Sequence, residues 1–270
     1  MKKRVPLIAA LLLMAVSAFS NDWKLGVQAW TFRKFTLCET LDQLSAMGVK
    51  YIEMYPGQKI GGGIEGTTHF GMDAATRKAV QAKLDAAGIK ILSYGVVSGK
   101  NEADWRKLFG FAKTMGIGII VSEPNPQDYD LLVRLTKEYG IPIGIHNHAK
   151  PTNRYWKPQT VLDAVKDRPG LFAAPDNGHW ARSGIRTVDG YKLLEGQMIS
   201  LHLKDQETFG NPAKNICVPF GTGVCNLPAA IAELKRQDYK GNVIIEFESH
   251  TDNPAPYVKK CVDWFNANAR

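Results

Sequence analysis

Short apolar segments alternate with helical segments along the whole chain, and this alternation constrains the fold more than any other feature. The apolar segments are rich in β-branched residues and are apolar at successive positions, which is typical of parallel strands covered by helices. Four helical segments end in a glycine directly before the next strand, where a left-handed residue ends a helix most easily. We therefore expect eight strands, over residues 24–30, 50–55, 89–97, 117–122, 141–146, 171–176, 198–203 and 243–247.

A strand–helix unit repeated eight times predicts an α/β protein with a single (β/α)8 TIM barrel. The length of 270 residues suits one such domain, since a barrel needs about 250 residues. A doubly wound open sheet is the alternative. It is disfavoured because Gln28-Ala29-Trp30-Thr31 stands where that fold carries a glycine-rich phosphate loop. We place the barrel domain over residues 21–270, with a helix capped by Asp73 and a long flexible loop over residues 56–71.

Residues 1–20 have the pattern of a signal peptide. Basic residues at positions 2–4 precede an apolar run over 5–16 and small residues at Ala18 and Ser20. The apolar run is too short for a permanent membrane anchor. The sequence predicts a periplasmic or secreted protein with no membrane segment after cleavage, and the alternative is a buried N-terminal helix.

The charge and the cysteine content limit which partners and cross-links we expect. Three of the 34 basic residues lie in the leader, which leaves 31 against 26 acidic residues. This excess is spread along the chain, so we expect no nucleic-acid partner. The spacing of the four cysteines matches no zinc or redox motif. Disulfide bonds and buried free thiols are both consistent with it. The oligomeric state is also open.

Polar residues gather where the expected strands end. Imidazoles and carboxylates that converge on one rim would be costly to bury separately, and a shared metal ion is the simplest common partner. Mixed nitrogen and oxygen ligands suit Mn, Co, Zn or Fe as a single divalent ion. All six histidines of the chain lie at or just beyond the C-terminal end of an expected strand. The strand-end residues are Glu53, Tyr55, Glu123, His146, His148, Asp176, His179, His202, Lys204, Asp205, Glu246 and Glu248.

At these residues the sequence resembles the sugar isomerase/epimerase superfamily of xylose-isomerase-like barrels. Three motifs carry the resemblance, namely Asp176-Asn-Gly-His179, Ser200-Leu-His202-Leu-Lys204-Asp205 and Ile244-Ile-Glu246-Phe-Glu248. The resemblance implies a metal-dependent enzyme that acts on a carbohydrate. Asp176, His202 and Glu246 would be metal ligands, and His179 would contact the substrate.

One position departs from the family's epimerases, which place a glutamate ligand at the end of the fifth strand. This chain has His146 there, so either His146 or Glu123 completes the metal shell. With Glu246 as base, the family resemblance implies proton removal beside a sugar carbonyl through a metal-stabilised enediolate. A histidine acid, His146 or His148, paired with that base would instead suit elimination.

The expected leader favours an unphosphorylated sugar, because phosphorylated sugars are mostly cytoplasmic. The alternative reaction is that of the superfamily's exported branch, which resembles lyases and hydratases of 3-keto-glycosides. A nuclease and a non-catalytic sugar-binding barrel are further alternatives.

Four other residues are candidate substrate contacts, each with a structural alternative. Trp30 and Trp180 could stack on a sugar face or fill the barrel. Lys204 could neutralise the enediolate or pair with Asp205 or Glu246. Glu53 could bind a substrate hydroxyl or support a ligand from behind.

Overall fold

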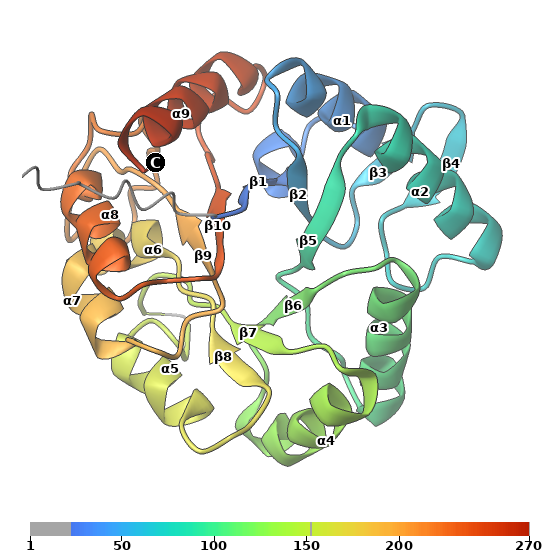
Figure 1. The fold of residues 1–270 in the computed structure, drawn as a ribbon, viewed down its shortest axis with the longest axis horizontal. Helices are drawn as coiled ribbons and strands as arrows, with labels where there is room; N and C mark the ends of the chain where they lie inside the picture. Colours follow the sequence, from blue (N-terminus) through green and yellow to red (C-terminus); the bar gives the residue numbers. More distant parts are fainter. Residues whose placement is uncertain (1–22, 152, 270) are drawn as a thin grey trace, which may run out of the picture.

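The computed structural model describes residues 23–151 and 153–269, so the expected leader lies outside the described residues. Eight parallel strands form one sheet in the order β8-β7-β6-β5-β2-β1-β10-β9. The helices surround this sheet (Figure 1). The eight strands are β1 (Leu25–Gln28), β2 (Tyr51–Met54), β5 (Lys90–Tyr94), β6 (Ile119–Ser122), β7 (Ile143–Ile145), β8 (Leu171–Ala173), β9 (Ser200–Leu203) and β10 (Asn242–Ile245).

The helices of the described chain fill the intervals between the strands. Helices such as α2 and α4 bury one face, through Val80 and Leu84 or through Leu132 and Leu135. The helices are α1 (Leu37–Ala46), α2 (Ala74–Ala87), α3 (Glu102–Thr114), α4 (Tyr129–Tyr139), α5 (Pro158–Val165), α6 (Asn177–Arg182), α7 (Thr187–Leu193), α8 (Leu227–Arg236) and α9 (Ala255–Asn268), with 3-10 turns η1 (Ala29–Phe32) and η2 (Pro126–Asp128).

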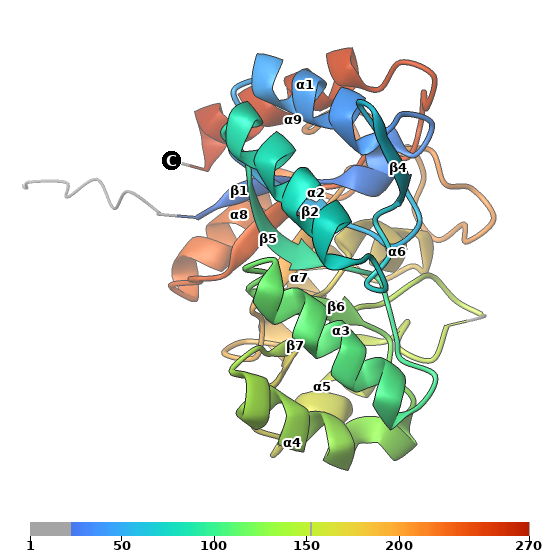
Figure 2. The ribbon, with the colours of Figure 1, turned by 90° about the vertical axis from the view of Figure 1, so that its right-hand side faces the viewer.

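The sheet closes between β8 and β9 through isolated bridges rather than a continuous ladder. One bridge pairs Ala173 with Met198, and a second pairs Asp176 with His202. All strands run in one direction, so their C-terminal ends share one face of the barrel (Figure 2). The predicted (β/α)8 barrel is confirmed.

Local sequence signals account for the element boundaries. Each expected strand range overlaps an observed strand, and Asp73 caps α2 by accepting a 2.7 Å hydrogen bond from the Thr76 amide. The four glycines expected to end helices have φ between 65° and 75°, in the left-handed region. They are Gly48, Gly88, Gly116 and Gly140.

The expected loop over residues 56–71 is instead partly ordered as a hairpin, so this prediction is wrong. Strands β3 (Lys59–Gly61) and β4 (Ile64–Thr67) pair antiparallel there. The hydroxyl of Thr68 ties the base together by donating to Tyr55 O at 2.7 Å and accepting from Gln58 N at 3.1 Å. The glycine run therefore forms a tight turn, because its residues have positive φ.

Within the described part of the chain, no helix is long and apolar enough to cross a membrane.

The four cysteines are free thiols, and three of them are buried. Burial raises the pKa of Cys217 and of Cys261 to about 12. Cys38 is partly exposed and lies at the start of α1.

We expect a thiol reagent to label Cys38 alone in the folded protein, because the other three cysteines are buried. After unfolding, all four should react, since each can then form the reactive thiolate. Titration with a chromogenic disulfide at about pH 8, before and after addition of guanidinium chloride, measures this. Protein purified without reductant that shows fewer than four thiols when unfolded would contradict the free-thiol assignment.

Candidate active site

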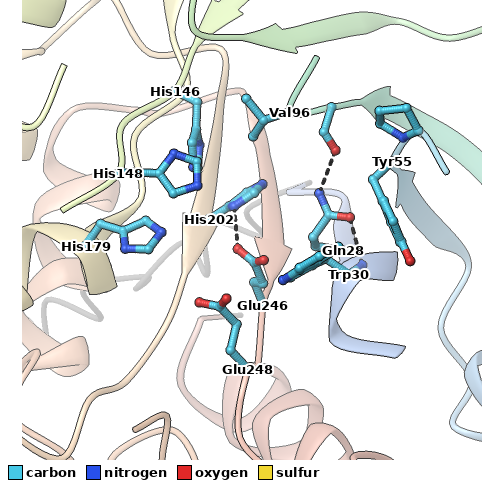
Figure 3. A pocket seen from close by; sticks show the side chains of 12 residues that line it. Gln28, Trp30, Tyr55, Val96, His146, His148, His179, His202, Glu246 and Glu248 are labelled. Carbon is cyan, nitrogen blue, oxygen red and sulfur yellow. Dashed lines mark hydrogen bonds and ion pairs between the residues drawn. The ribbon is translucent and has the colours of Figure 1, made fainter. Parts of the chain in front are cut away.

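A cavity of about 270 Å³ opens among the C-terminal ends of the barrel strands. Figure 3 shows His146, His148 and His179 on one side and Trp30 and Tyr55 on the other, with His202, Glu246 and Glu248 between them. In this fold the C-terminal face is where functional residues gather. The cavity is lined by Gln28, Trp30, Tyr55, Pro56, Gly95, Val96, His146, His148, His179, His202, Glu246 and Glu248.

Three buried side chains from adjacent strand ends form the centre of the site. His146 follows β7, Asp176 follows β8 and His202 lies in β9, and their ligand atoms lie within 4.8 Å of one another. Asp176 is fixed from two sides. Its Oδ1 accepts a 3.0 Å bond from His179 N at the start of α6, and Asn147 exchanges hydrogen bonds with its backbone. The carboxylate is therefore held in place before any ligand arrives.

His202 lies between two carboxylates. Its Nδ1 is 2.9 Å from Glu246 Oε2, and its Nε2 is 2.7 Å from Glu53 Oε1. Burial works against the charged imidazolium, but Glu53 and Glu246 outweigh it and hold the pKa of His202 well above its ordinary value. Both ring nitrogens of His202 therefore face a carboxylate.

Glu53 is fully buried behind His202 and is not among the cavity-lining residues. Gln28 donates a 2.5 Å hydrogen bond to its Oε1, and Ser93 donates to its Oε2. The predicted contact between Glu53 and substrate is therefore not what the structure shows. Glu53 supports His202, which was the alternative interpretation.

Lys204 is almost fully buried and contacts three carboxylates. Its Nζ lies 2.9 Å from Asp176 Oδ2, 2.9 Å from Glu246 Oε2 and 2.7 Å from Glu248 Oε2. Burial disfavours the ammonium, yet these carboxylates raise the pKa of Lys204 well above its ordinary value. In turn, Lys204 overcomes the effect of burial and holds the pKa of Glu246 below its usual range. Asp205, the other expected partner, instead accepts backbone hydrogen bonds from Gly221 and Gly223.

Gly178 allows α6 to approach Lys204 closely. A Cβ at this position would lie 2.7 Å from Cβ and Cδ of Lys204. Lys204 cannot retreat without breaking its ion pairs, so the glycine of the Asp176-Asn-Gly-His179 motif has a packing role.

We expect Gly178→Ala to lower the free energy of unfolding by about 1–3 kcal/mol through overpacking. Gly110→Ala is the matched control. That glycine lies inside α3 with nothing within 4 Å of an added Cβ, so alanine should stabilise the protein by about 0.4–1 kcal/mol. Urea unfolding of both variants measures the difference, and equal effects of the two substitutions would refute the packing role.

His148 and Glu123 form a separate pair at the rim. His148 Nδ1 is 2.6 Å from Glu123 Oε1, and Asn153 donates a 2.6 Å hydrogen bond to Glu123 Oε2. Glu123 does not line the cavity and is outside the groups whose ligand atoms cluster. Of the two candidates for the last ligand position, His146 is the one that lies with Asp176 and His202.

His179 lines the cavity, and burial lowers its pKa to about 3. Its Nδ1 lies 3.1 Å from Arg182 Nη1, and its Nε2 lies 3.7 Å from Asp176 Oδ2. The other two histidines, His69 and His250, stack on Phe70 and Tyr257 outside the cavity. Four of the six histidines therefore converge.

Trp30 and Trp180 have different roles. Trp30 is 41% exposed, lines the cavity and meets the edge of Tyr55 with ring centroids 5.1 Å apart. Trp180 is completely buried, because α6 directs it against Tyr191 and Gly190. Trp180 cannot stack on a ligand in this structure, so its prediction as a sugar platform is wrong.

Sequence reasoning did not single out Gln28, Arg182 and Asn215. Gln28 ends β1, so its strand-end position was a usable signal. Arg182 lies one helical turn after His179. Asn215 donates to Glu248 Oε2 at 2.9 Å from the long segment between β9 and α8, where no sequence pattern indicates its position.

The donor set suits a divalent metal ion. His146 Nδ1 is buried without a hydrogen-bond partner, and His146 clusters with Asp176 and His202. Glu246 adjoins this cluster through His202, since its Oε2 lies 2.9 Å from His202 Nδ1. Histidine and carboxylate together suit Zn, Mn, Co or Fe. These four residues could hold such an ion.

A nearly closed parallel barrel with imidazoles and carboxylates around a cavity at its C-terminal mouth defines the structural class. The chain belongs to the xylose isomerase-like TIM barrel family, whose model matches residues 41–268.

Among curated proteins, a 73-residue stretch is 41% identical to L-ribulose-5-phosphate 3-epimerase UlaE of Salmonella paratyphi C, and also to that of Salmonella choleraesuis. The stretch covers 27% of this chain and 24% of either relative, so the chain matches about a quarter of their length.

Solved structures share the fold over nearly the whole chain. An uncharacterised protein from Parabacteroides distasonis is 29% identical with a TM-score of 0.74, and the match covers 91% of this chain and 99% of that one. A D-psicose 3-epimerase solved with D-fructose has a TM-score of 0.70 at 12% identity, covering 91% and 99%. The IOLI protein with a bound zinc atom has a TM-score of 0.71 at 16% identity, covering 91% and 98%.

Proposed function

We propose that this protein is a divalent-metal-dependent sugar isomerase or epimerase that removes a proton beside the carbonyl of an unphosphorylated sugar. The observation that carries the proposal is the cluster of His146, Asp176 and His202 at the cavity, with Glu246 in contact with His202. Family membership and the epimerases among the similar proteins support it.

His146, Asp176, His202 and Glu246 would hold the ion. A divalent ion there would polarise the sugar carbonyl and stabilise negative charge on the enediolate.

Glu246 is the base in this proposal. Its Oε2 is engaged by His202 and Lys204, so Oε1 is the oxygen that can take a substrate proton. Lys204 keeps Glu246 ionised and therefore ready to accept. On the opposite wall, Trp30 offers an exposed ring against which a sugar face can stack.

The cavity lining supports an unphosphorylated substrate. Its twelve residues include no arginine or lysine, the side chains that usually bind phosphate. The nearby Lys204 is already paired with three carboxylates. Export by the expected leader is part of the same proposal, and intact mass of the protein recovered from the periplasm would test cleavage near Asn21.

A second candidate is a lyase or hydratase of 3-keto-glycosides. The observation in its favour is the His148–Glu123 pair, since a carboxylate that accepts from Nδ1 leaves Nε2 of the imidazole to face the cavity. His148 is placed to interact with a leaving-group oxygen, and His146 is adjacent at a ring-centroid distance of 4.9 Å.

The two reactions share proton removal and differ in product. We expect an unphosphorylated ketose or a 3-keto-glycoside to exchange its α-proton with D₂O, and a chelator to abolish the exchange. Product analysis by NMR assigns the reaction, since a new ketose or aldose indicates isomerisation and a released aglycone indicates elimination. Purified protein without stoichiometric metal would refute the proposal and favour a non-catalytic barrel, and cleavage of an abasic duplex would favour a nuclease.

A further inference from the structure

Three histidines at the mouth, His146, His148 and His179, also bring their ring nitrogens within 4.8 Å of one another. Three imidazoles with an open position are a common catalytic zinc set. Whether His179 can join such a set depends on which of its nitrogens carries the proton, and a neighbouring arginine decides this.

Arg182 Nη1 lies 3.1 Å from His179 Nδ1. A guanidinium has only donors and keeps its proton in proteins. Nδ1 of His179 must therefore be the acceptor, and the single proton of the neutral ring is on Nε2. This nitrogen is the one near Asp176 Oδ2, at 3.7 Å.

Arg182 is itself held in place. Its Nη2 donates to Pro212 O at 2.5 Å, in the segment between β9 and α8. The same segment is joined to α6 by Gly210 N, which donates to Ala181 O at 2.8 Å. The guanidinium therefore bridges this segment and His179, and does not depend on a flexible side chain alone.

We propose that Arg182 is a positioning residue that fixes His179 as a neutral Nε2–H donor, reserved for a substrate oxygen and excluded from metal binding. This inference rests on the proposed function for the identity of the substrate. An N–H group requires an acceptor, so His179 would bind a substrate oxygen through one of its lone pairs. It leaves the mouth with one metal position, because a protonated Nε2 has no lone pair for an ion.

The direct test is the tautomer of His179, read from ring nitrogen shifts in ¹⁵N-histidine protein loaded with Zn²⁺ or treated with chelator. His179→Gln assigns the signal. The unsubstituted protein should show the Nε2–H form in both states. Arg182→Glu should shift the ring to the Nδ1–H form, because a carboxylate accepts where the guanidinium donated. Arg182→Lys, which keeps a donor, should retain the Nε2–H form.

Arg186→Glu is the matched control, because Arg186 lies four residues after Arg182, is exposed and pairs with Asp189. It should leave the His179 signal unchanged. Backbone amide spectra establish that each variant folds. If Arg182→Glu does not fold, Arg182→Met replaces it in the test. Its His179 ring signal should then move or broaden, because the acceptor nitrogen has lost its donor.

Turnover and metal content complete the test. We expect kcat/KM to fall about 10- to 100-fold in Arg182→Glu, the range for loss of one hydrogen bond to a charged group. In Arg182→Lys, which keeps a donor, kcat/KM should stay within about threefold. An Nδ1–H tautomer in the unsubstituted protein, or a second Zn²⁺ equivalent lost in His179→Gln, would overturn the inference. Absence of any bound metal or turnover would instead count against the proposed function, since the tautomer is read without substrate.

Discussion

Replacing Lys204 with methionine should lower the free energy of unfolding by about 3–5 kcal/mol, the usual cost of removing one partner from a buried ionic cluster. Methionine fills similar space but leaves Asp176, Glu246 and Glu248 without the ammonium they share. For a chain of this size the melting temperature should fall by roughly 6–20 °C. Calorimetry in the presence of chelator measures the effect without contribution from bound metal.

The same variant should gain more stability from Zn²⁺ than the unsubstituted protein does. Lys204 Nζ lies against oxygens of Asp176 and Glu246 that belong to the proposed ligand set, so its removal concentrates negative charge there. Tighter binding to the folded state raises the melting temperature in proportion to the logarithm of affinity. Lys259→Met is the control, because that lysine pairs with Asp263 at the surface and should cost no more than about 1 kcal/mol. If both variants melt alike, the cluster is not held by charge.

Replacing Glu246 with glutamine should reduce turnover by about 10²- to 10⁴-fold, the range for loss of a general base. The amide keeps the shape of the side chain but cannot accept the substrate proton, and its oxygen is a weaker metal ligand. Exchange of the substrate α-proton with D₂O at saturating metal isolates the base, since added metal compensates for weaker binding.

Glu248→Gln gives the matched comparison within the site. Glu248 contacts Lys204 and lines the cavity as Glu246 does, but Glu246 is the one 2.9 Å from His202. We expect Glu248→Gln to bind Zn²⁺ as the unsubstituted protein does and to retain measurable proton exchange. Glu65→Gln, on the exposed hairpin, should be indistinguishable from the unsubstituted protein. Equal losses in Glu246→Gln and Glu248→Gln would refute the assignment of the base.

The fold was predictable because its signals are local. Glycines such as Gly88 and Gly140 end helices by taking a conformation that other residues rarely adopt, and Asp73 begins one through a single hydrogen bond. The convergence of strand-end residues followed from the architecture, since parallel strands bring Asp176 and His202 to one rim. The predicted resemblance to xylose isomerase-like barrels is confirmed by the family match.

Side-chain direction was not predictable at single positions. Glu123 and His146 both directly follow strands, yet His146 clusters with Asp176 and His202 while Glu123 pairs with His148. A change of one position along an extended chain reverses the side-chain direction, and the sequence does not specify where each strand ends to that accuracy. The prediction that Trp180 stacks on a sugar was wrong for a related reason, since the short helix α6 directs this side chain into the core.

The incomplete closure of the barrel runs through the candidate site. β8 and β9 are joined by two isolated bridges, and one of these pairs Asp176 with His202. A ligand that binds both residues would therefore cross-link β8 and β9 at the least continuous junction of the sheet. Opening of that junction and release of the ligand would then be one event. Backbone amides that bond across the junction from either side, such as Ala173 and Ile199, should exchange with solvent more slowly once the ligand is bound.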